Sequence, residues 1–198
     1  MKRLTGIFVS FAEKKEHTPY SLFAKNIQED GGKMIRLSRD FFNRSTVQVA
    51  QELLGKRLTF KGISGVVTET EAYTGLDDPA SHAHRGPTPR AEIMFGEPGY
   101  TYVYFIYGMY HCLNIVTEPE GSPGAVLIRG LRLPNQHLNG PGKICKALGI
   151  TKEHHGLDLV SHPDFYMSEG DSPVVYQATP RIGIKRATDK LWRFVMRG

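Results

Sequence analysis

One stretch of the chain has the 3.6-residue hydrophobic period of an amphipathic helix, whereas most of the remainder has the two-residue period of β-strands. The helical stretch spans 46–54, and the apolar residues that recur in it at helical spacing are Val47, Ala50, Leu53 and Leu54. Ser45 and Gln48 fit a capping box at its start, in which each side chain bonds to the other residue's backbone N–H. Gly55 stands where a glycine commonly ends a helix.

Extended segments are recognised by alternating, β-branched and aromatic residues between turn-forming ones. On this basis we predict strands over 57–60, 66–73, 100–107, 112–116, 125–131, 180–184 and 191–196. The third and fourth of these form a hairpin with Tyr107 near its tip. Residues 75–98 are rich in Gly, Pro, Asp and His, which indicates a long loop. A second helix is expected to begin near Pro141 and to end near Leu148.

These elements predict an α+β fold in a single domain. Strands outnumber helices, most connections suit antiparallel pairing, and no internal repeat is found. We expect a mainly antiparallel, curved β-sheet with a protruding β-hairpin and surrounding helices, spanning residues 34–198. Residues 1–33 are polar and aperiodic, which indicates a disordered N-terminal arm. The tetrapeptide GGKM at 31–34 could equally be a translated ribosome-binding site, in which case Met34 is the natural start.

Composition is that of a soluble globular protein. The 198 residues suffice for one domain with a sizeable core, and 40% hydrophobic and 23% charged residues are ordinary proportions. No apolar run approaches the roughly 20 residues that span a bilayer. No secretory signal is evident, and two cysteines far apart fit a reducing compartment, so we expect a cytoplasmic protein without a membrane partner. The net charge of +5 suits a polyanionic partner, although many soluble proteins carry as much.

Two carboxylates on the strand predicted over 66–73 are the first candidates for chemistry. Strand parity places Glu69, Glu71 and Tyr73 on one face. A partly shielded carboxylate beside an aromatic ring can activate a water molecule. The alternative, which spacing alone favours, is that one or both glutamates pair with surface arginines. Neighbours on one strand face are roughly 7 Å apart, a spacing too uncertain to assign a glycosidase pair of either stereochemistry.

A cluster of tyrosines marks the predicted hairpin, at Tyr100, Tyr102, Tyr104, Tyr107 and Tyr110. Most such stripes are aromatic faces of a core. Rings on a strand can also stack on nucleic-acid bases, and each such contact contributes about 1–3 kcal/mol. Tyr107 lies at the expected tip beside a glycine, where a side chain is better placed to protrude than to join a core.

The sequence predicts neither a metal site nor a cofactor. Its histidines and cysteines match no HExxH or zinc-binding spacing. Residues 139–143, NGPGK, superficially resemble a phosphate-binding loop. The first glycine of that motif is absent, however, and Ile144 occupies its Ser/Thr position. The helix N-terminus there could still hold a backbone phosphate.

Five segments together resemble the alkyladenine (3-methyladenine) DNA glycosylase family of bacterial type. In chain order they are VTETEAYTGLDDPASHAHRG, TPRAEIMFGEPGYTYVYFIYGMYHCLNIV, GAVLIRGL, NGPGKICKALGI and PRIGI, which cover most of residues 66–184. Any one segment would be weak, but five in the family's order are highly specific. The chain departs from the family pattern in a shorter connector at 132–138, in the extension before Met34 and in stopping at Gly198.

The resemblance implies a monofunctional DNA glycosylase of base excision repair. Such an enzyme binds double-stranded DNA, flips a damaged purine nucleotide into a pocket and hydrolyses its N-glycosidic bond. The implied substrates are alkylated or deaminated purines, with 3-methyladenine first and hypoxanthine or ethenoadenine as further candidates. We expect a monomer that uses no cofactor.

The resemblance also implies roles for residues of this chain. Glu71 matches the general base, while Arg129 and the main-chain carbonyl of Ile182 match groups that help hold the attacking water. The positions that match contacts to the flipped base are Tyr73, His82, Tyr104 and Asn114. The amide of Asn114 corresponds to the group that crowds the exocyclic amine of guanine.

Contacts to the duplex are implied at three further positions. Tyr107 matches the side chain that fills the gap left by the flipped nucleotide. Gly140 and Lys143 fall in a family region near the DNA backbone.

Two other functions stay open at this point. A lysine such as Lys143 could form a Schiff base in a bifunctional glycosylase/lyase. The chain could also be a basic, tyrosine-rich module that binds deformed nucleic acid without cutting it.

Overall fold

The computed structural model describes residues 34–106, 108–170 and 174–197. The arm predicted for 1–33 and the hairpin-tip residue Tyr107 lie outside these residues. Within the described ranges, no helix is both long enough and apolar enough to cross a membrane.

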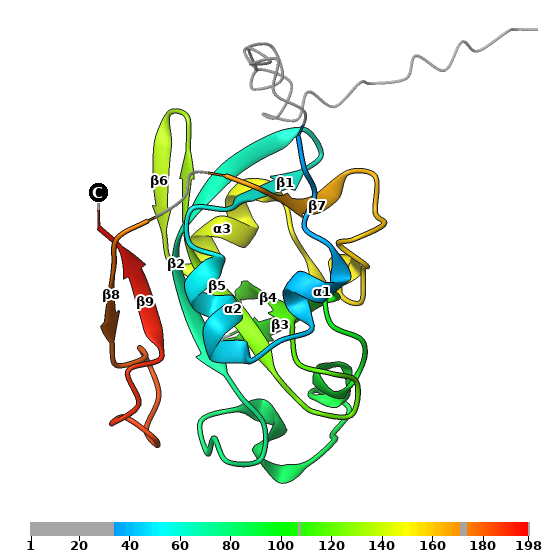
Figure 1. Ribbon diagram of the computed structural model, residues 1–198, viewed down its shortest axis with the longest axis vertical. Helices are drawn as coiled ribbons and strands as arrows, with labels where there is room; N and C mark the ends of the chain where they lie inside the picture. The colour runs from blue at the N-terminus through cyan, green and yellow to red at the C-terminus, as the bar shows by residue number, and fades with distance from the viewer. Residues whose placement is uncertain (1–33, 107, 171–173, 198) are drawn as a thin grey trace, which may run out of the picture. The chain divides into compact units, whose positions relative to one another are not determined.

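Nine strands of the described chain form one curled sheet, in which every pairing is antiparallel (Figure 1). In chain order they are β1 (Arg57–Phe60), β2 (Ile63–Tyr73), β3 (Thr101–Ile106), β4 (Tyr110–Val116), β5 (Ala125–Leu133), β6 (Gln136–Asn139), β7 (Phe165–Ser168), β8 (Tyr176–Thr179) and β9 (Arg193–Met196). The order across the sheet is β3-β4-β5-β2-β1-β7, while β6 pairs with β5, and β9 pairs with both β2 and β8. The predicted α+β fold with a mainly antiparallel, curved sheet is confirmed.

Short helices accompany the sheet. The α-helices of the described residues are α1 (Arg39–Phe42), α2 (Thr46–Glu52) and α3 (Pro141–Leu148), and the 3-10 helices are η2 (His82–Arg85), η3 (Glu92–Phe95) and η4 (Lys152–His154). Figure 1 shows α2 and α3 inside the curve of the sheet. The hydroxyl of Thr70 on β2 donates to the carbonyl of Ala50 in α2 over 2.7 Å. Helix α2 therefore packs on the face of β2 opposite to Glu69 and Glu71.

The central strands present one face to the core and the other to a cavity. The core side chains contributed by β3, β4 and β5 are Val103, Leu113, Ile115, Val126, Ile128 and Leu131. The residues of the same strands that line the cavity are Tyr102, Tyr104, Ile106, Cys112, Asn114, Ala125, Leu127 and Arg129. The two sets alternate along the strands as far as Arg129, so the two-residue period that predicts the strands also divides core from cavity. The alternation is interrupted after Arg129, and Leu131 belongs to the core.

The pairing of β2 with β5 is irregular next to the cavity. The register shifts on both sides of Glu69, so that Glu69 pairs with Gly130 while Thr70 pairs with Ile128. Arg129 is thereby left without a partner in the register. Irregularities of this kind re-aim side chains, and the guanidinium of Arg129 reaches the carboxylate of Glu69 (Nε–Oε1 3.0 Å).

The predicted strand over 180–184 is wrong. The strand of this region is β8, which ends at Thr179, and the chain then bends. Gly183 adopts a left-handed conformation (φ 77°), which no strand accommodates. The side chain of Arg181 is buried and donates to the carbonyl of Ala72 on β2, which ties the bend to the sheet. Residues 132–138, described from the sequence as a connector, belong instead to a hairpin formed by β5 and β6.

The capping box predicted at the start of α2 is absent, because Ser45 makes no side-chain capping hydrogen bond. Glu118, far along the chain, replaces it. Its Oε1 accepts hydrogen bonds from the backbone N–H of Thr46 (2.6 Å) and from the hydroxyl of the same residue (2.8 Å). The helix itself ends at Glu52, two residues earlier than predicted.

Replacing Glu118 by Ala should therefore lower the free energy of unfolding by about 0.5–2 kcal/mol, the usual contribution of a helix cap. Glu118 has a positive φ (68°). This backbone strain is similar for Glu and for Ala at position 118, so it does not obscure the comparison of the unchanged protein with the variant. Urea denaturation measures the change. Glu120→Ala, at an exposed neighbouring position, is the matched control. Equal stability of the two variants would show that Glu118 does not cap α2.

Candidate active site

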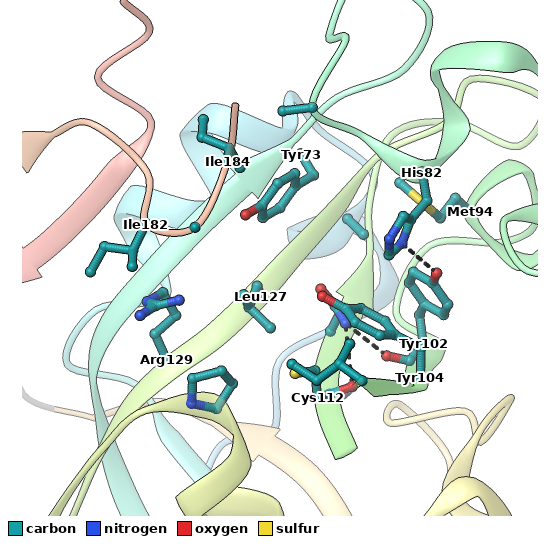
Figure 2. Close-up of a pocket in the computed structure, with 16 residues that line it drawn as sticks. Tyr73, His82, Met94, Tyr102, Tyr104, Cys112, Leu127, Arg129, Ile182 and Ile184 are labelled. Carbon is teal, nitrogen blue, oxygen red and sulfur yellow. Dashed lines mark hydrogen bonds between the residues drawn. The ribbon is translucent and has the colours of Figure 1, made fainter. Parts of the chain in front are cut away.

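A cavity of about 400 Å³ opens on the side of β3, β4 and β5 that faces away from the core (Figure 2). Its volume is in the range of small-molecule sites. The residues predicted for the site that line it are Tyr73, His82, Tyr104, Asn114, Arg129 and Ile182. In Figure 2, Tyr73, Ile182 and Arg129 lie across the cavity from His82, Tyr102 and Tyr104.

Glu71 lies directly behind this lining, and its side chain has 0% exposure. Its Oε2 accepts a hydrogen bond from the hydroxyl of Tyr73 (2.8 Å), and its Oε1 accepts one from the backbone N–H of Ile182 (2.8 Å). The Nε of Arg129 is 3.4 Å from Oε1. All three partners line the cavity, so the carboxylate lies next to it. Ile182 thus contacts Glu71 through its N–H, and the role predicted for its carbonyl stays a prediction.

The surroundings of Glu71 act on its protonation in opposite directions. Burial raises the pKa of the carboxyl group above its ordinary value. The positive charge of Arg129 and the hydrogen bonds from Ile182 and Tyr73 offset part of this rise by favouring the ionised form. Burial and the nearby Glu71 also raise the pKa of Tyr73, so its phenol keeps the proton that it donates. A carboxyl group with a raised pKa is suited to act as a general base.

The spacing along the strand left open whether one or both glutamates pair with arginines. In the structure Glu69 forms such ion pairs. Its Oε1 lies 3.0 Å from Nε of Arg129 and 2.6 Å from Nε of Arg193. Glu69 does not line the cavity. The two carboxylates of one strand face therefore differ, because Glu69 is held between two arginines whereas Glu71 is buried with a single, more distant one.

Aromatic rings form the opposite wall of the cavity. The ring of His82 meets that of Tyr104 edge to face, with centroids 4.8 Å apart, and its Nδ1 is 2.8 Å from the hydroxyl of Tyr102. His82 is open to solvent through the cavity and packed by rings on other sides. This desolvation, with a smaller effect of the Arg90 charge, lowers the pKa of His82 to about 4. The ring is therefore neutral near pH 7.

Arg90 lies next to the two tyrosines of this wall. Its positive charge acts on the hydroxyl of Tyr102, the hydrogen-bond partner of His82. The same guanidinium lies over the ring of Tyr104, 4.9 Å from its centroid.

Strand β4 supplies two further lining residues, Cys112 and Asn114. The amide nitrogen of Asn114 donates to the carbonyls of Tyr102 (3.0 Å) and Cys112 (3.4 Å), which fixes the orientation of this buried side chain. Burial raises the pKa of Cys112 to about 11, so its thiol is protonated and a poor nucleophile. Across the described ranges, no three His, Cys, Asp or Glu side chains gather as a metal site requires.

Two positions predicted to contact DNA, Gly140 and Lys143, are not part of the cavity lining. Gly140 precedes α3 and Lys143 lies in its first turn, near Pro141, which does line the cavity. Lys143 is exposed, and its ammonium donates to the side chain of Asn139 over 2.6 Å. Tyr107 lies outside the described residues. The roles of these three positions stay predictions.

Sequence reasoning missed several residues around the cavity. The sequence indicates Tyr102 only as a member of the tyrosine cluster, and strand parity with Tyr104 could have assigned it to the site. No local pattern indicates that Arg90 lies over Tyr104, since it belongs to an aperiodic loop. Nor does any pattern indicate that Arg181, beside Ile182, is buried against Asp78 with hydrogen bonds of 2.5 and 2.7 Å.

The raised pKa of Glu71 can be measured directly. A ¹³C NMR titration of the side-chain carboxyl carbon, assigned by its loss in Glu71→Gln, should give a midpoint above the ordinary carboxyl value. Tyr73→Phe should move the midpoint higher still, because it removes a hydrogen bond to the ionised form. Tyr176→Phe, on strand β8, is the control and should leave it unchanged. A midpoint in the ordinary range would contradict the environment described for Glu71.

Comparisons with known proteins agree on one family. Residues 40–198 match the family model described as methylpurine-DNA glycosylase. Three relatives carry the name "Putative 3-methyladenine DNA glycosylase". The protein of Sodalis glossinidius is 58% identical over 161 residues, and that of Wolbachia sp. subsp. Brugia malayi (strain TRS) is 57% identical over 161 residues; each alignment covers 80% of this chain and 95% of the relative. The protein of Rickettsia felis is 53% identical over 167 residues, covering 83% and 94%. The chain belongs to the methylpurine-DNA glycosylase family.

Proposed function

We propose that this protein removes damaged purines from duplex DNA by hydrolysing the N-glycosidic bond, with a water molecule activated by Glu71. Family membership supplies the coarser statement, a DNA glycosylase that acts in DNA repair. The observation that carries the finer one is a fully buried carboxylate, held by Tyr73, Arg129 and the Ile182 N–H behind the wall of an aromatic cavity. A carboxylate placed there is costly for the fold, so a catalytic task is a better explanation than a structural one.

The proposed reaction follows from this placement. The damaged nucleotide is flipped out of the duplex into the cavity. Water attacks C1′ of the sugar while Glu71 accepts a proton from it, and the base leaves with the bonding electrons. The sugar gains positive charge as the bond breaks, and the ionised carboxylate stabilises that charge. Arg129 and the carbonyl of Ile182 orient the water.

The cavity wall accounts for binding of the base. Tyr73, His82 and Tyr104 offer rings for stacking, with about 1–3 kcal/mol for each base–ring contact. The Nε2 atom of His82 is left for a hydrogen bond with the base, because Nδ1 is bonded to the hydroxyl of Tyr102. Asn114, fixed by two hydrogen bonds, crowds the exocyclic amine of guanine.

Contacts to the duplex complete the proposal. Tyr107 fills the space that the flipped nucleotide leaves, and Gly140 and Lys143 contact the DNA backbone. The net charge of +5 favours association with the polyanion.

A purine that already carries positive charge needs the least help to leave. Alkylation at N3 gives such a cation, which departs as a neutral base, whereas hypoxanthine is neutral and must gain a proton. The pKa of His82 is lowered to about 4, and burial raises the pKa of Tyr73, Tyr104 and Cys112. None of these four groups is a ready proton donor near pH 7. Cationic lesions are therefore the preferred substrates.

The lyase alternative has less support. Lys143 donates to Asn139, is exposed and does not line the cavity, so it is poorly placed to attack a sugar beside Glu71. A module that only binds nucleic acid does not account for the buried carboxylate of Glu71.

Glu71→Gln should bind a 3-methyladenine duplex as the unchanged protein does, yet release base about 10²–10⁴-fold more slowly, the contribution typical of a general base. Fluorescence anisotropy measures binding, and single-turnover base release measures the chemical step. Glu69→Gln, on the same strand face, is the matched control and should lose far less. Normal release by Glu71→Gln would remove Glu71 from the mechanism, and a borohydride-trapped adduct with the unchanged protein would favour the lyase.

The rates of base release from duplexes that each carry one lesion rank the substrates. We expect faster single-turnover release of 3-methyladenine than of hypoxanthine or ethenoadenine at pH 7, because none of His82, Tyr73, Tyr104 and Cys112 is a ready proton donor to a neutral base. Undamaged guanine in the same sequence is the control and should not be released. Hypoxanthine released as fast as 3-methyladenine would show that the proton comes from a group that we have not identified.

A further inference from the structure

One buried ion pair lies next to the proposed site without lining the cavity. The guanidinium of Arg181 donates to both carboxylate oxygens of Asp78, over 2.5 Å and 2.7 Å, and neither side chain has any solvent exposure. Such a pair is a poor means of stabilising a fold, because desolvating two charges offsets most of their attraction. Its location therefore calls for an explanation other than stability.

The pair connects three parts of the chain that meet at Glu71. Asp78 organises the loop that leads to His82, because its carboxylate accepts from the backbone N–H groups of Thr74 (3.3 Å) and Ala80 (3.2 Å). Arg181 also donates to the carbonyl of Ala72 over 2.9 Å. Ala72 is the β2 residue between Glu71 and Tyr73 in the sequence.

Arg181 also lies against two groups that hold Glu71. Its guanidinium is 4.7 Å from the centroid of the Tyr73 ring, whose hydroxyl donates to Glu71. The next residue in the chain is Ile182, whose backbone N–H donates to the other carboxylate oxygen. Residues 180–184 form no strand, so no ladder of backbone hydrogen bonds fixes this N–H. Arg181, the residue before Ile182, holds the N–H in place instead, because its own side chain is bonded to β2.

We propose that Asp78 and Arg181 are a positioning pair for Glu71, which holds the Ile182 N–H and the Tyr73 ring against the carboxylate without contacting substrate. This inference rests on the proposed function of Glu71. Losing the pair should release the bend at 181–184 from β2 and weaken both hydrogen bonds to Glu71. Each of these bonds favours the ionised carboxylate, so the base should then become protonated at higher pH.

The pH dependence of the chemical step separates positioning from mere stability. The charged and titratable groups around Glu71 are Glu69 and Tyr73 on β2, Arg129 on β5, Cys112 on β4 and, beyond Glu69, Arg193 on β9. None of them is altered in the variants below. The pair itself adds the charge of Arg181 next to Tyr73 and the opposite charge of Asp78, and the double variant removes both together. A change in the acidic limb of the profile therefore reports the contacts that the pair maintains.

The test compares single-turnover base release across pH in a double variant, Asp78→Asn with Arg181→Gln, which leaves no unpaired buried charge. We expect the acidic limb to move up by about half a pH unit or more. The rate on the plateau should fall by about tenfold, as small misplacements of a catalytic group do. Asp158→Asn with Arg39→Gln is the control, since that ion pair (2.9 Å) also joins distant segments, but its contacts are with other residues than the three that hold Glu71. Its acidic limb should not move.

Arg181→Lys tests the same idea if the double variant does not fold, as circular dichroism will show. Lysine keeps a charge opposite Asp78 but cannot reach both Asp78 and the Ala72 carbonyl with a planar fork. An upward shift in this variant supports the pair's role. An unmoved acidic limb in either folded variant overturns it, whatever happens to thermal stability. If the unchanged protein releases no base, the proposed function fails, and the NMR midpoint of Glu71 in Arg181→Lys still decides whether the pair positions the carboxylate.

Discussion

The burial of one carboxylate, that of Glu71, is the constraint on which the architecture of the site depends. Removing an unpaired carboxylate from water costs more than a domain of this size can offset, so opposite charge and hydrogen-bond donors must surround it. The three groups that do so belong to different elements: Tyr73 ends β2, Arg129 lies at the irregular pairing of β5, and Ile182 belongs to the bend after β8. The irregular register and the unpaired bend are thus conditions for burying this charge.

The two faces of the sheet explain how core and cavity coexist in a small domain. On β3, β4 and β5, as far as Arg129, residues of the core cluster, which also contains residues of α2 and α3, alternate with residues that line the cavity. The loop at 75–98 closes the cavity side with a small apolar cluster of its own, which includes Ala83, Ala91 and Met94 around Tyr102. Loop residues such as His82 are therefore held by packing, as a rigid binding wall requires.

The sequence predicted those features that arise from local periodicity. The alternation along 66–73 placed Glu71 and Tyr73 on one face, and their hydrogen bond shows that they share it. Local periodicity could not reveal interactions between distant segments. Glu118 caps α2 in place of Ser45, and the PRIGI segment, β-branched in character, bends because Arg181 is bonded to Ala72 and Gly183 has positive φ. Family resemblance, rather than periodicity, pointed to Arg129 and Ile182, and neither pointed to Asp78 or Arg90.

The pairing of β9 with β2 has a consequence for the synthesis of this protein. Arg193 on β9 bonds to Glu69 across 124 residues of sequence, and the same strand pairs with Glu71. At ribosomal rates of about 5–20 residues per second, roughly 6–25 s separate the emergence of these two strands. For that time the edge of β2 that faces away from β5 has no partner at residues 69–71, and an unpaired strand edge is a site of misassociation. The nascent chain thus pairs this edge of the strand that carries Glu71 only after the other described strands of the sheet have been made.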